Sequence, residues 1–416
     1  MYLTLLVCDV KAIKFRIYPT LAQRRQLIKE FVARRHVWNW ALECRSSAYK
    51  ADKTTLNAVA LSRLLTQRKA SDTSLKAVSA TALTYTLRDL DEAFQRFFSK
   101  QARYPKRKKF GTVNSVCYQI DKRQPVFRDG ELLKLPKLGA VDVVWSKSIP
   151  VTPNSATVSK TPDGRWFVSL QYDADDAVAV PKTGKAVGID LGLTCFAAMS
   201  DGNKIKPPRP LRAGLRKLAN AQRALSRAKK GSNGRRKAKV RVAKVHSRIA
   251  DQRADFLHKL STSIVVEHDQ IAVEDLSVRG MMANRKLARS IGDASWSEFR
   301  RQLTYKAGWY GKTLCVTPRF SRSTGVCPEC GVVGEKLPLS VREWTCACGA
   351  VHDRDIAAAQ VILKTARNAG FAGGGRNKPN DRGVSPENTA VFEAGKAQFA
   401  RPHGRGQRTP IHGARS

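Results

Sequence analysis

The first signal in the chain is an alternation of hydrophobic and polar positions over residues 11–18, which is typical of a half-buried β-strand. The alternation returns over residues 156–160 and 166–172, on either side of Pro162-Asp163-Gly164. A turn of that composition between two alternating segments predicts a β-hairpin. Because the first strand has no partner near it in sequence, we expect it to pair with this later β-region.

A helical period separates these strands. Thr20 and Gln23 have the spacing of a capping box at the start of a helix. Leucines and phenylalanines then recur at spacings of four and three residues and predict a second long helix; they are Leu83, Leu87, Leu90, Phe94 and Phe97. We therefore expect a mainly helical region over residues 20–103, inserted into a small β-domain.

From residue 185 the pattern changes to α/β. Residues 186–190 and 194–199 predict two strands, and a third apolar strand ends at Glu274 after a helix that contains Phe256 and Leu260.

Within this region, residues 202–250 hold 17 Lys and Arg and no acid. Apolar residues persist on both sides of Gly231-Ser232-Asn233-Gly234, which predicts two amphipathic helices joined at that turn, with a basic outer face. A merely solvated helical hairpin is the alternative, but a solvated surface normally mixes both signs of charge.

The composition adds a strong charge imbalance. Among 416 residues, 75 Lys and Arg stand against 34 Asp and Glu, a formal net charge of +41. Repulsion of that size disfavours a compact state unless a polyanion neutralises it, which argues against ordinary chemistry on small neutral substrates. Since 42% of the residues are hydrophobic, the chain can bury cores, and wholesale disorder is excluded.

The two ends of the chain give simpler expectations. The apolar run 3–8 is too short for a membrane span and lacks the flanks of a signal peptide, so we expect a soluble, intracellular protein. Residues 369–416 are rich in Gly, Pro, Arg and Asn without apolar periodicity, and we expect a disordered tail.

Four of the nine cysteines form a cluster. Two residues separate Cys327 from Cys330, which gives a C-x2-C motif. One residue separates Cys346 from Cys348, which gives a C-x-C motif followed by Gly349. Each pair presents two thiolates from a tight turn, and four thiolates close a tetrahedral zinc shell with no open position. Four free cysteines are the alternative, which this spacing disfavours.

Three acidic positions accompany apolar segments. Asp190 ends one predicted strand and Glu274 ends another, while His352-Asp353-Arg354-Asp355 opens a helix of small and apolar residues. Any one of them alone is more often a cap or an ion-pair member. Three in so basic a chain indicate carboxylates converging on hard divalent cations. Two such cations about 4 Å apart activate water and stabilise the leaving oxygen of a phosphodiester.

Taken together, these motifs resemble the TnpB (OrfB) proteins of bacterial insertion sequences, in order over residues 11 to about 365. The resemblance is carried by residues 11–20, 38–42, 188–192, 274–281, 305–307 and 309–311, the cysteine cluster and residues 352–355.

The resemblance implies a multidomain α/β fold. A RuvC-like nuclease domain of RNase H fold, with an inserted zinc ribbon, would follow a β-barrel wedge domain interrupted by a helical recognition domain. The implied boundaries are 1–19 and 104–182 for the wedge domain, 20–103 for the recognition domain, 183–320 and 349–368 for the nuclease domain, 321–348 for the zinc-bearing target-nucleic-acid-binding module and 369–416 for the tail.

Carried over position by position, the resemblance implies a catalytic triad of Asp190, Glu274 and Asp355 that binds two Mg²⁺ ions. It also implies a structural Zn²⁺ bound by the four cysteines. Asp355 is preferred over Asp353 because the family pattern is an aspartate, one further residue, an asparagine and two alanines. Asp355 begins Asp-Ile-Ala-Ala-Ala, with Ala357 in place of that asparagine. Asp275 should point to the opposite strand face and be structural.

The implied activity is that of a transposon-encoded RNA-guided DNA endonuclease related to the type V CRISPR effectors. Its partners would be a guide RNA from the transposon end and double-stranded target DNA beside a short flanking motif, with no membrane. We expect a monomer in the bacterial cytoplasm, on the nucleoid when bound to DNA. Candidate phosphate contacts are Arg107, Lys108 and Lys109 after the helical region, and Arg235, Arg236 and Lys237 in the basic hairpin.

Two other functions remain open at this point. One is an RNA-guided or plain DNA-binding regulator without cleavage. The other is an accessory transposase, which would need a DNA-joining activity.

Overall fold

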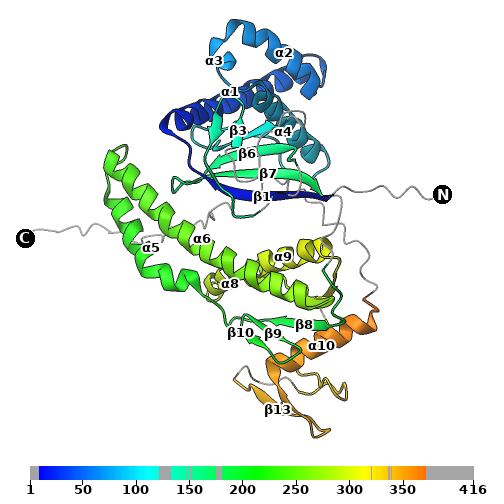
Figure 1. The fold of residues 1–416 in the computed structure, drawn as a ribbon. Helices are drawn as coiled ribbons and strands as arrows, with labels where there is room; N and C mark the ends of the chain where they lie inside the picture. The colour runs from blue at the N-terminus through cyan, green and yellow to red at the C-terminus, as the bar shows by residue number, and fades with distance from the viewer. Residues whose placement is uncertain are drawn as a thin grey trace, which may run out of the picture.

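The computed structural model describes residues 9–120, 133–147, 149, 152–174, 180–319, 321–335, 338 and 340–371. The apolar run 3–8 and nearly all of the expected tail lie outside these residues. The described chain forms an N-terminal lobe of helices and a sheet, and a C-terminal lobe with its own sheet and helices (Figure 1).

The N-terminal lobe is built on a five-stranded sheet of order β2-β6-β7-β1-β5. Its first strand, β1, pairs antiparallel with β7 along its whole length, with Ile13 opposite Leu170, so the predicted long-range pairing is confirmed. The predicted hairpin is confirmed as β6 and β7. The strands of this lobe are β1 (Asp9–Ile17), β2 (Ser115–Gln119), β3 (Leu133–Leu135), β4 (Gly139–Val141), β5 (Val143–Val144), β6 (Ser155–Lys160) and β7 (Trp166–Ala174).

Four helices lie between β1 and β2 in the chain: α1 (Leu21–Asp52), α2 (Ala58–Ser71), α3 (Thr73–Lys76) and α4 (Ala80–Phe98). The capping box is present, because Thr20 and Gln23 each accept a hydrogen bond from the other's backbone N–H. Leu27 and Phe31 of α1 belong to the core of the sheet, whereas other apolar residues of α1, α2 and α4 form a core of their own. The helices therefore rest on the sheet as an insertion.

The C-terminal lobe is organised by a second five-stranded sheet, of order β10-β9-β8-β11-β12. Strands β8, β9 and β10 are antiparallel neighbours, whereas β11 and β12 run parallel to β8. The strands are β8 (Ala186–Leu191), β9 (Ala197–Met199), β10 (Lys204–Ile205), β11 (Gln270–Glu274) and β12 (Thr313–Thr317), and a separate hairpin is formed by β13 (Glu343–Thr345) and β14 (Val351–Asp353). The second predicted strand is thus shorter than residues 194–199.

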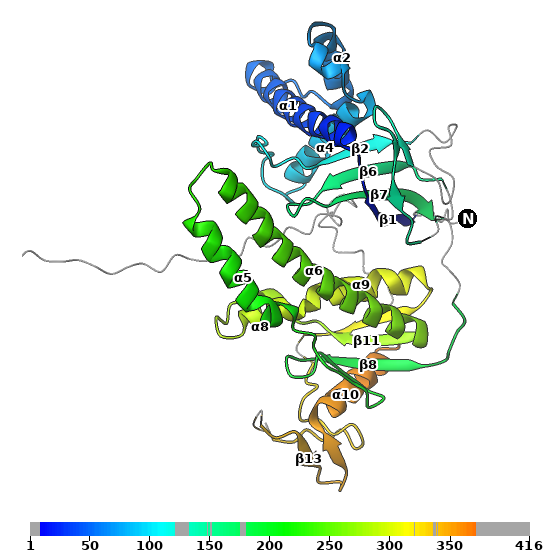
Figure 2. The ribbon, with the colours of Figure 1, turned by 60° about the vertical axis from the view of Figure 1, so that its left-hand side comes forward.

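Helices cover both faces of this sheet. Figure 2 shows α6 and α9 on the face toward the N-terminal lobe and α10 on the opposite face. The helices are α5 (Pro210–Arg227), α6 (Asn233–Glu267), α7 (Val278–Met281), α8 (Ala288–Ala294), α9 (Trp296–Trp309) and α10 (Arg354–Asn368).

The basic hairpin is confirmed as α5 and α6, but α6 is longer than the sequence pattern indicated. It continues without interruption through Phe256 and Leu260, which the sequence pattern had assigned to a separate helix. No glycine or proline interrupts residues 235–267, so nothing ends the helix between the two apolar stretches.

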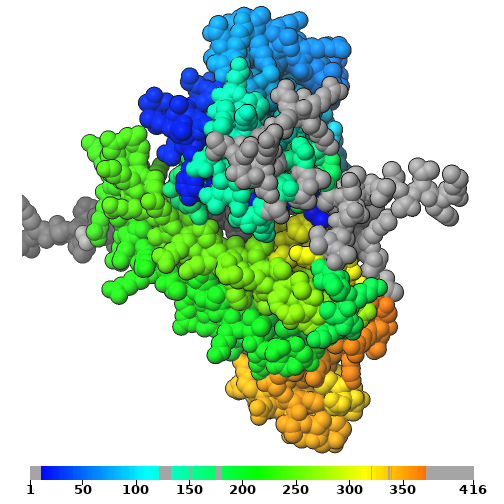
Figure 3. Space-filling view, viewed as in Figure 1, coloured from blue at the N-terminus to red at the C-terminus, as the bar shows by residue number. Residues whose placement is uncertain are grey.

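Helices α6 and α9 of the C-terminal lobe both contact the N-terminal lobe. Arg165, in the β6–β7 turn, forms an ion pair with Asp251 of α6 at 2.7 Å. Lys11 of β1 lies over the ring of Trp309 in α9, 5.4 Å from its centroid. In the space-filling view, the green α5–α6 segment lies between the blue and teal N-terminal lobe and the orange tip of the molecule (Figure 3).

Candidate functional site

The three proposed catalytic acids come from β8, β11 and α10. In the parallel pair, Ile189 of β8 lies opposite Val273 of β11. The next residues, Asp190 and Glu274, therefore occupy equivalent positions at one edge of the sheet. Asp355 lies in the first turn of α10, which packs across β8.

Gly188 lets α10 approach the sheet closely. A Cβ atom at Gly188 would lie 2.1 Å from the carbonyl oxygen of Ala359 and 2.9 Å from the Cβ of Leu363. Ala359 lies one turn after Asp355 on α10. The missing side chain at Gly188 thus sets the distance between the strand that bears Asp190 and the helix that bears Asp355.

The charges of the three acids interact. Burial, followed by the negative charges of Glu274 and Asp355, raises the pKa of Asp190 to about 7. Both causes disfavour the ionised carboxylate. An added cation at this edge would relieve the repulsion, so the donor set fits a hard divalent ion. Among the described residues, the four cysteines form a cluster of donor atoms close enough to hold a metal ion, and the three carboxylates do not form a second one.

Asp353 has a different role from Asp355. Its carboxylate caps α10 by accepting hydrogen bonds from the backbone N–H groups of Asp355 and Ile356, each at 3.1 Å. It also pairs with Lys204 Nζ at 2.5 Å. Burial opposes ionisation of Asp353, but the Lys204 contact and the backbone hydrogen bonds outweigh burial and lower the pKa.

Asp275, next to Glu274, is paired with two arginines. Its oxygens accept hydrogen bonds from Arg300 at 2.5 Å and Arg319 at 2.7 Å. These guanidinium groups lower the pKa of Asp275 despite partial burial. The geometry agrees with a structural role beside Glu274.

Two further contacts to the acids were not visible in the sequence pattern. Ser323 Oγ donates a hydrogen bond to Glu274 Oε1, and Arg342 Nη1 lies 3.4 Å from Asp355 Oδ1. Both residues come from the segment around the cysteine cluster; Ser323 is 49 residues from Glu274 in sequence and Arg342 is 13 residues from Asp355. No local spacing signals such contacts, because they depend on how that segment folds back over the sheet edge.

The four cysteines meet as predicted. Their sulfur atoms all lie within 4.8 Å of one another, from the turn at Cys327 and Cys330 and the turn at Cys346 and Cys348. Gly349 has a φ of +86°, the left-handed conformation expected for it at the second turn.

The environment of Cys327 favours its thiolate. Burial alone would raise the pKa of Cys327, but hydrogen bonds from the backbone N–H groups of Cys330 and Glu329 and the contact with His352 bring it to about 6. His352 Nε2 lies 3.1 Å from Cys327 Sγ, a neighbour that the sequence analysis did not assign to the cluster. His352 belongs to β14, which runs directly into the capped start of α10.

The six candidate phosphate contacts have different surroundings. In the segment after α4, Lys108 Nζ lies 4.4 Å above the ring of Trp38, and Arg107 is 3.6 Å from Glu43. Lys109 is exposed.

In the hairpin, Lys237 is also exposed, and Arg236 donates to Asn233. Arg235 is half-buried, and its guanidinium donates to the carbonyls of Leu225 and Ala228 at 2.9 Å each, which ties the start of α6 to the end of α5.

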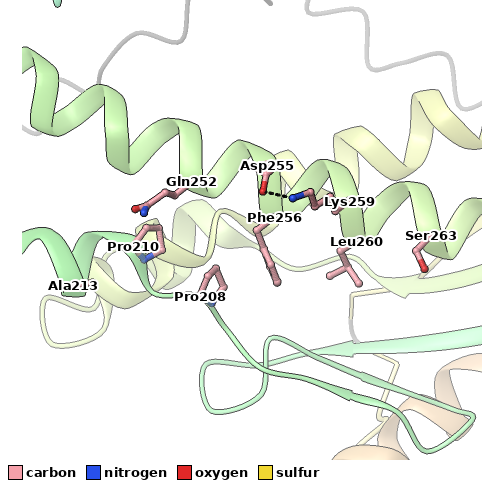
Figure 4. A pocket seen from close by; sticks show the side chains of 9 residues that line it. All are labelled: Pro208, Pro210, Ala213, Gln252, Asp255, Phe256, Lys259, Leu260 and Ser263. Atoms are coloured by element: carbon pink, nitrogen blue, oxygen red, sulfur yellow. Dashed lines mark hydrogen bonds and ion pairs between the residues drawn. The ribbon is translucent and has the colours of Figure 1, made fainter. Parts of the chain in front are cut away.

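A cavity of about 600 Å³ lies against α6, away from these acids and cysteines. Figure 4 shows Phe256 and Leu260 on one side of α6, with Phe256 near Pro208 of the connection into α5 and Pro210 at the start of α5, while Asp255 and Lys259 are paired on α6. None of the proposed catalytic or zinc-binding residues lines this cavity. No helix in the described parts of the chain is long and apolar enough to cross a membrane.

Comparison with known proteins gives three matching family profiles. Residues 169–285 match OrfB_IS605, described as "Probable transposase", residues 296–362 match the "Cas12f1-like, TNB domain", and residues 10–54 match an OrfB_IS605 "Helix-turn-helix domain". In the structure, however, this last segment is a strand followed by one long helix.

Individual proteins are also similar. A Streptomyces pristinaespiralis protein named "Putative RNA-guided DNA endonuclease" is 43% identical over 88% of this chain and 91% of its own length. The "CRISPR-associated endodeoxyribonuclease Cas12f1" of Sulfoacidibacillus thermotolerans is 24% identical over 48% of this chain and 50% of its own. A solved Cas12f1 chain, from a complex with sgRNA and target DNA, is similar in fold, with a TM-score of 0.50, 12% identity and coverage of 85% of this chain and 98% of that one.

The sheet, the helices on both of its faces and this structural likeness define an α/β fold shared with that Cas12f1 chain. Within that class, the extent and identity of the sequence match are specific. The chain belongs to the TnpB (OrfB) family.

Proposed function

We propose that the protein is a transposon-encoded, RNA-guided endonuclease that hydrolyses phosphodiester bonds of target DNA next to a short flanking motif. The observation that carries the proposal is the placement of Asp190 and Glu274 at equivalent positions on neighbouring strands, close enough to Asp355 for the three charges to interact, in a chain of net charge +41. The Streptomyces relative supports the RNA-guided, DNA-directed activity through its name and its similarity over most of the chain.

The three acids are proposed to bind two Mg²⁺ ions through their carboxylate oxygens. When bound, such ions supply Lewis-acid activation of water and charge stabilisation at the leaving oxygen. In addition to burial, the negative charges of Glu274 and Asp355 both raise the pKa of Asp190, so the ionisation of Asp190 depends on the other two acids. Ser323 and Arg342 orient Glu274 and Asp355 by direct contact. The antiparallel and parallel strand arrangement supports a RuvC-like domain of RNase H fold.

The four cysteines are proposed to bind one structural Zn²⁺ as a zinc ribbon. Thiolates suit zinc, and a closed four-sulfur site leaves no position for substrate. The β13–β14 hairpin and the two cysteine turns would form the ribbon. Zinc there would stabilise the segment that places Ser323, Arg342 and the start of α10.

We retain the domain division expected from the resemblance. The wedge domain, with the β-barrel architecture, would comprise residues 1–19 and 104–182, and the recognition domain residues 20–103. The nuclease domain would comprise residues 183–320 and 349–368, around the zinc module at 321–348. Support comes from the separate cores of the two sheets and of the N-terminal helices.

The proposed partners are a guide RNA and double-stranded DNA, bound by a monomer in the bacterial cytoplasm. Base pairing would read the target sequence, while protein contacts would read the flanking motif and backbone shape. The exposed Lys109 and Lys237 suit phosphate contacts best. For Arg107, Lys108, Arg235 and Arg236, any phosphate contact would compete with the partners that they already have.

The proposal is tested with the purified protein–RNA complex and a matching duplex DNA. Asp190→Ala should abolish Mg²⁺-dependent cleavage while DNA retardation in a gel remains. Asp201→Ala, at an exposed turn of the same lobe, should cleave like the wild type. Cleavage that survives Asp190→Ala would remove the mechanism. Retardation without product in the wild type would favour a regulator, and joined DNA products would favour a transposase.

A further inference from the structure

We propose that an aromatic cluster at the end of α4 is a stacking platform for unpaired bases of the bound RNA, an inference that rests on the RNA partner proposed above. The cluster consists of Phe94, Phe97, Phe98 and Tyr104. Neighbouring rings lie 5.3 to 6.1 Å apart between centroids; Phe94 and Phe98 are stacked, Phe97 and Phe98 are tilted, and Tyr104 meets Phe94 and Phe97 edge to face.

The inner side of the cluster is fixed. Phe94 is buried, and the Arg45 guanidinium lies over its ring at 4.1 Å while it pairs with Asp91 at 2.7 Å. The Tyr104 hydroxyl lies 2.8 Å from Ser46 Oγ of α1. A platform held this way loses little conformational freedom when it binds a ligand.

The outer side is open to solvent. Phe98 is 65% exposed and Tyr104 is 47% exposed, although both rings touch other aromatic rings. Single exposed apolar residues need no explanation, but contiguous exposed apolar surface is a common feature of binding sites.

The surrounding charge selects the ligand. Residues 93–120 contain no acid and seven Lys or Arg, at positions 96, 100, 103, 106, 107, 108 and 109; Arg96 pairs with Glu92 and Arg107 with Glu43, which leaves the other five without an acidic neighbour in this segment. Lys100 and Arg103 are exposed and lie in the short segment between Phe98 and Tyr104. The backbone of the basic segment is held against α1, where Trp38 Nε1 donates to the Lys106 carbonyl at 3.0 Å. Exposed rings interleaved with cations fit a polyanion that has aromatic faces, which is single-stranded nucleic acid.

Unpaired RNA is the occupant that the proposed function provides. Bases in a DNA duplex or an RNA–DNA heteroduplex are already stacked on their neighbours, so they offer no free face. A guide RNA stays bound before any target arrives and so would cover the rings throughout. The aromatic cluster would then hold a looped or terminal nucleotide of that RNA.

Binding measurements with defined strands test the platform. The probe is a fluorescein-labelled oligouridylate RNA of about 12 nucleotides, alone or annealed to its complement. Phe98→Ala should weaken binding of the single strand about fivefold or more, leave the duplex unchanged and leave the salt dependence unchanged, because the ring carries no charge. Phe98→Tyr should restore binding, and Val59→Ala, at a similarly exposed site on α2, should have no effect.

The alternatives give distinct results. Equal loss for single strand and duplex, or no loss, would overturn the platform, as would a change in the sedimentation of Phe98→Ala, which would indicate contact with a second copy. Wild-type protein that binds no RNA would overturn the RNA partner as well. Ultraviolet crosslinking of the purified protein–RNA complex should give a ribonucleotide adduct on the Phe98 peptide before DNA is added. An adduct seen only with added DNA would assign the site to DNA instead.

Discussion

Lys306 places a charged group in the packed contact between α6 and α9. Its ammonium donates to the carbonyl of His258 at 2.8 Å and to the hydroxyls of Ser261 and Thr262 at 2.7 Å each, and the residue is 5% exposed. Burial, with a smaller effect of Lys147, lowers the pKa of Lys306 to about 8. Neutral oxygens satisfy its N–H groups but do not replace the hydration of its charge.

This lysine should make stability depend on pH. In the unfolded chain its pKa is about 10.4, so the folded chain loses the proton first, and stability rises with pH from about 8. Lys306→Met removes that rise. The wild type should therefore gain about 2 kcal/mol relative to Lys306→Met between pH 7.5 and 9.5, measured by urea unfolding. A constant difference between the two proteins would contradict a buried charge, and Lys259→Met, at an exposed position, should show a constant difference.

At Cys327, the change of one atom tests the proposed zinc site. Cys327→Ser removes a thiolate from the four-sulfur cluster, so bound zinc should fall well below the expected one ion per chain. Metal analysis by mass spectrometry measures it. Cys195→Ser is the matched control, because its thiol hydrogen-bonds the carbonyls of Ala197 and Ile205 outside the cluster. Wild-type protein with less than one zinc would contradict the site.

Among the elements, the packing of α10 on β8 decides the geometry of the acids. The helix is capped by Asp353, carries Asp355 in its first turn and presses its Ala359 and Leu363 against the backbone of Gly188. The short β14 strand delivers the chain from the cysteine cluster straight into this helix. The position of Asp355 therefore depends on both contacts.

Gly188→Ala should move α10 and with it Asp355. The added Cβ meets a backbone carbonyl, which cannot rotate away, so we expect a loss of about 1–3 kcal/mol in the free energy of unfolding and a large loss of cleavage. Gly308→Ala is the control, because nothing lies within 4 Å of a Cβ there and alanine favours a helix by up to about 1 kcal/mol. Unchanged stability and cleavage in Gly188→Ala would contradict the tight contact.

At the scale of the whole molecule, much of the positive charge is concentrated in the basic hairpin α5–α6. The basic hairpin α5–α6 extends along the junction between the lobes (Figure 2). The Arg165–Asp251 ion pair attaches it to the N-terminal sheet. The acids of the sheet edge and the aromatic cluster lie in different lobes. A net charge of +41 repels itself unless RNA or salt neutralises it.

Added salt should therefore change the melting temperature of the RNA-free protein and of the protein–RNA complex in opposite directions. In the RNA-free chain, the melting temperature should rise between low and moderate NaCl, because screening reduces self-repulsion. In the protein–RNA complex, it should fall over the same range, because salt weakens phosphate contacts. Differential scanning fluorimetry compares the two. A decrease in both would argue against repulsion as the main term in the free chain.

Local patterns in the sequence determined most elements of this fold and the residue types of its site. The β6–β7 hairpin, the capping box of α1, the apolar spacing of α4 and the cysteine turns depend on neighbours within a few residues, so periodicity and turn chemistry predict them. The contacts of Ser323 and Arg342 with the acids, the His352–Cys327 contact and the approach of Ala359 to Gly188 were decided by the tertiary structure alone. These contacts join residues from different elements, so no local pattern predicts them. Only the packed arrangement of sheets and helices brings their groups together.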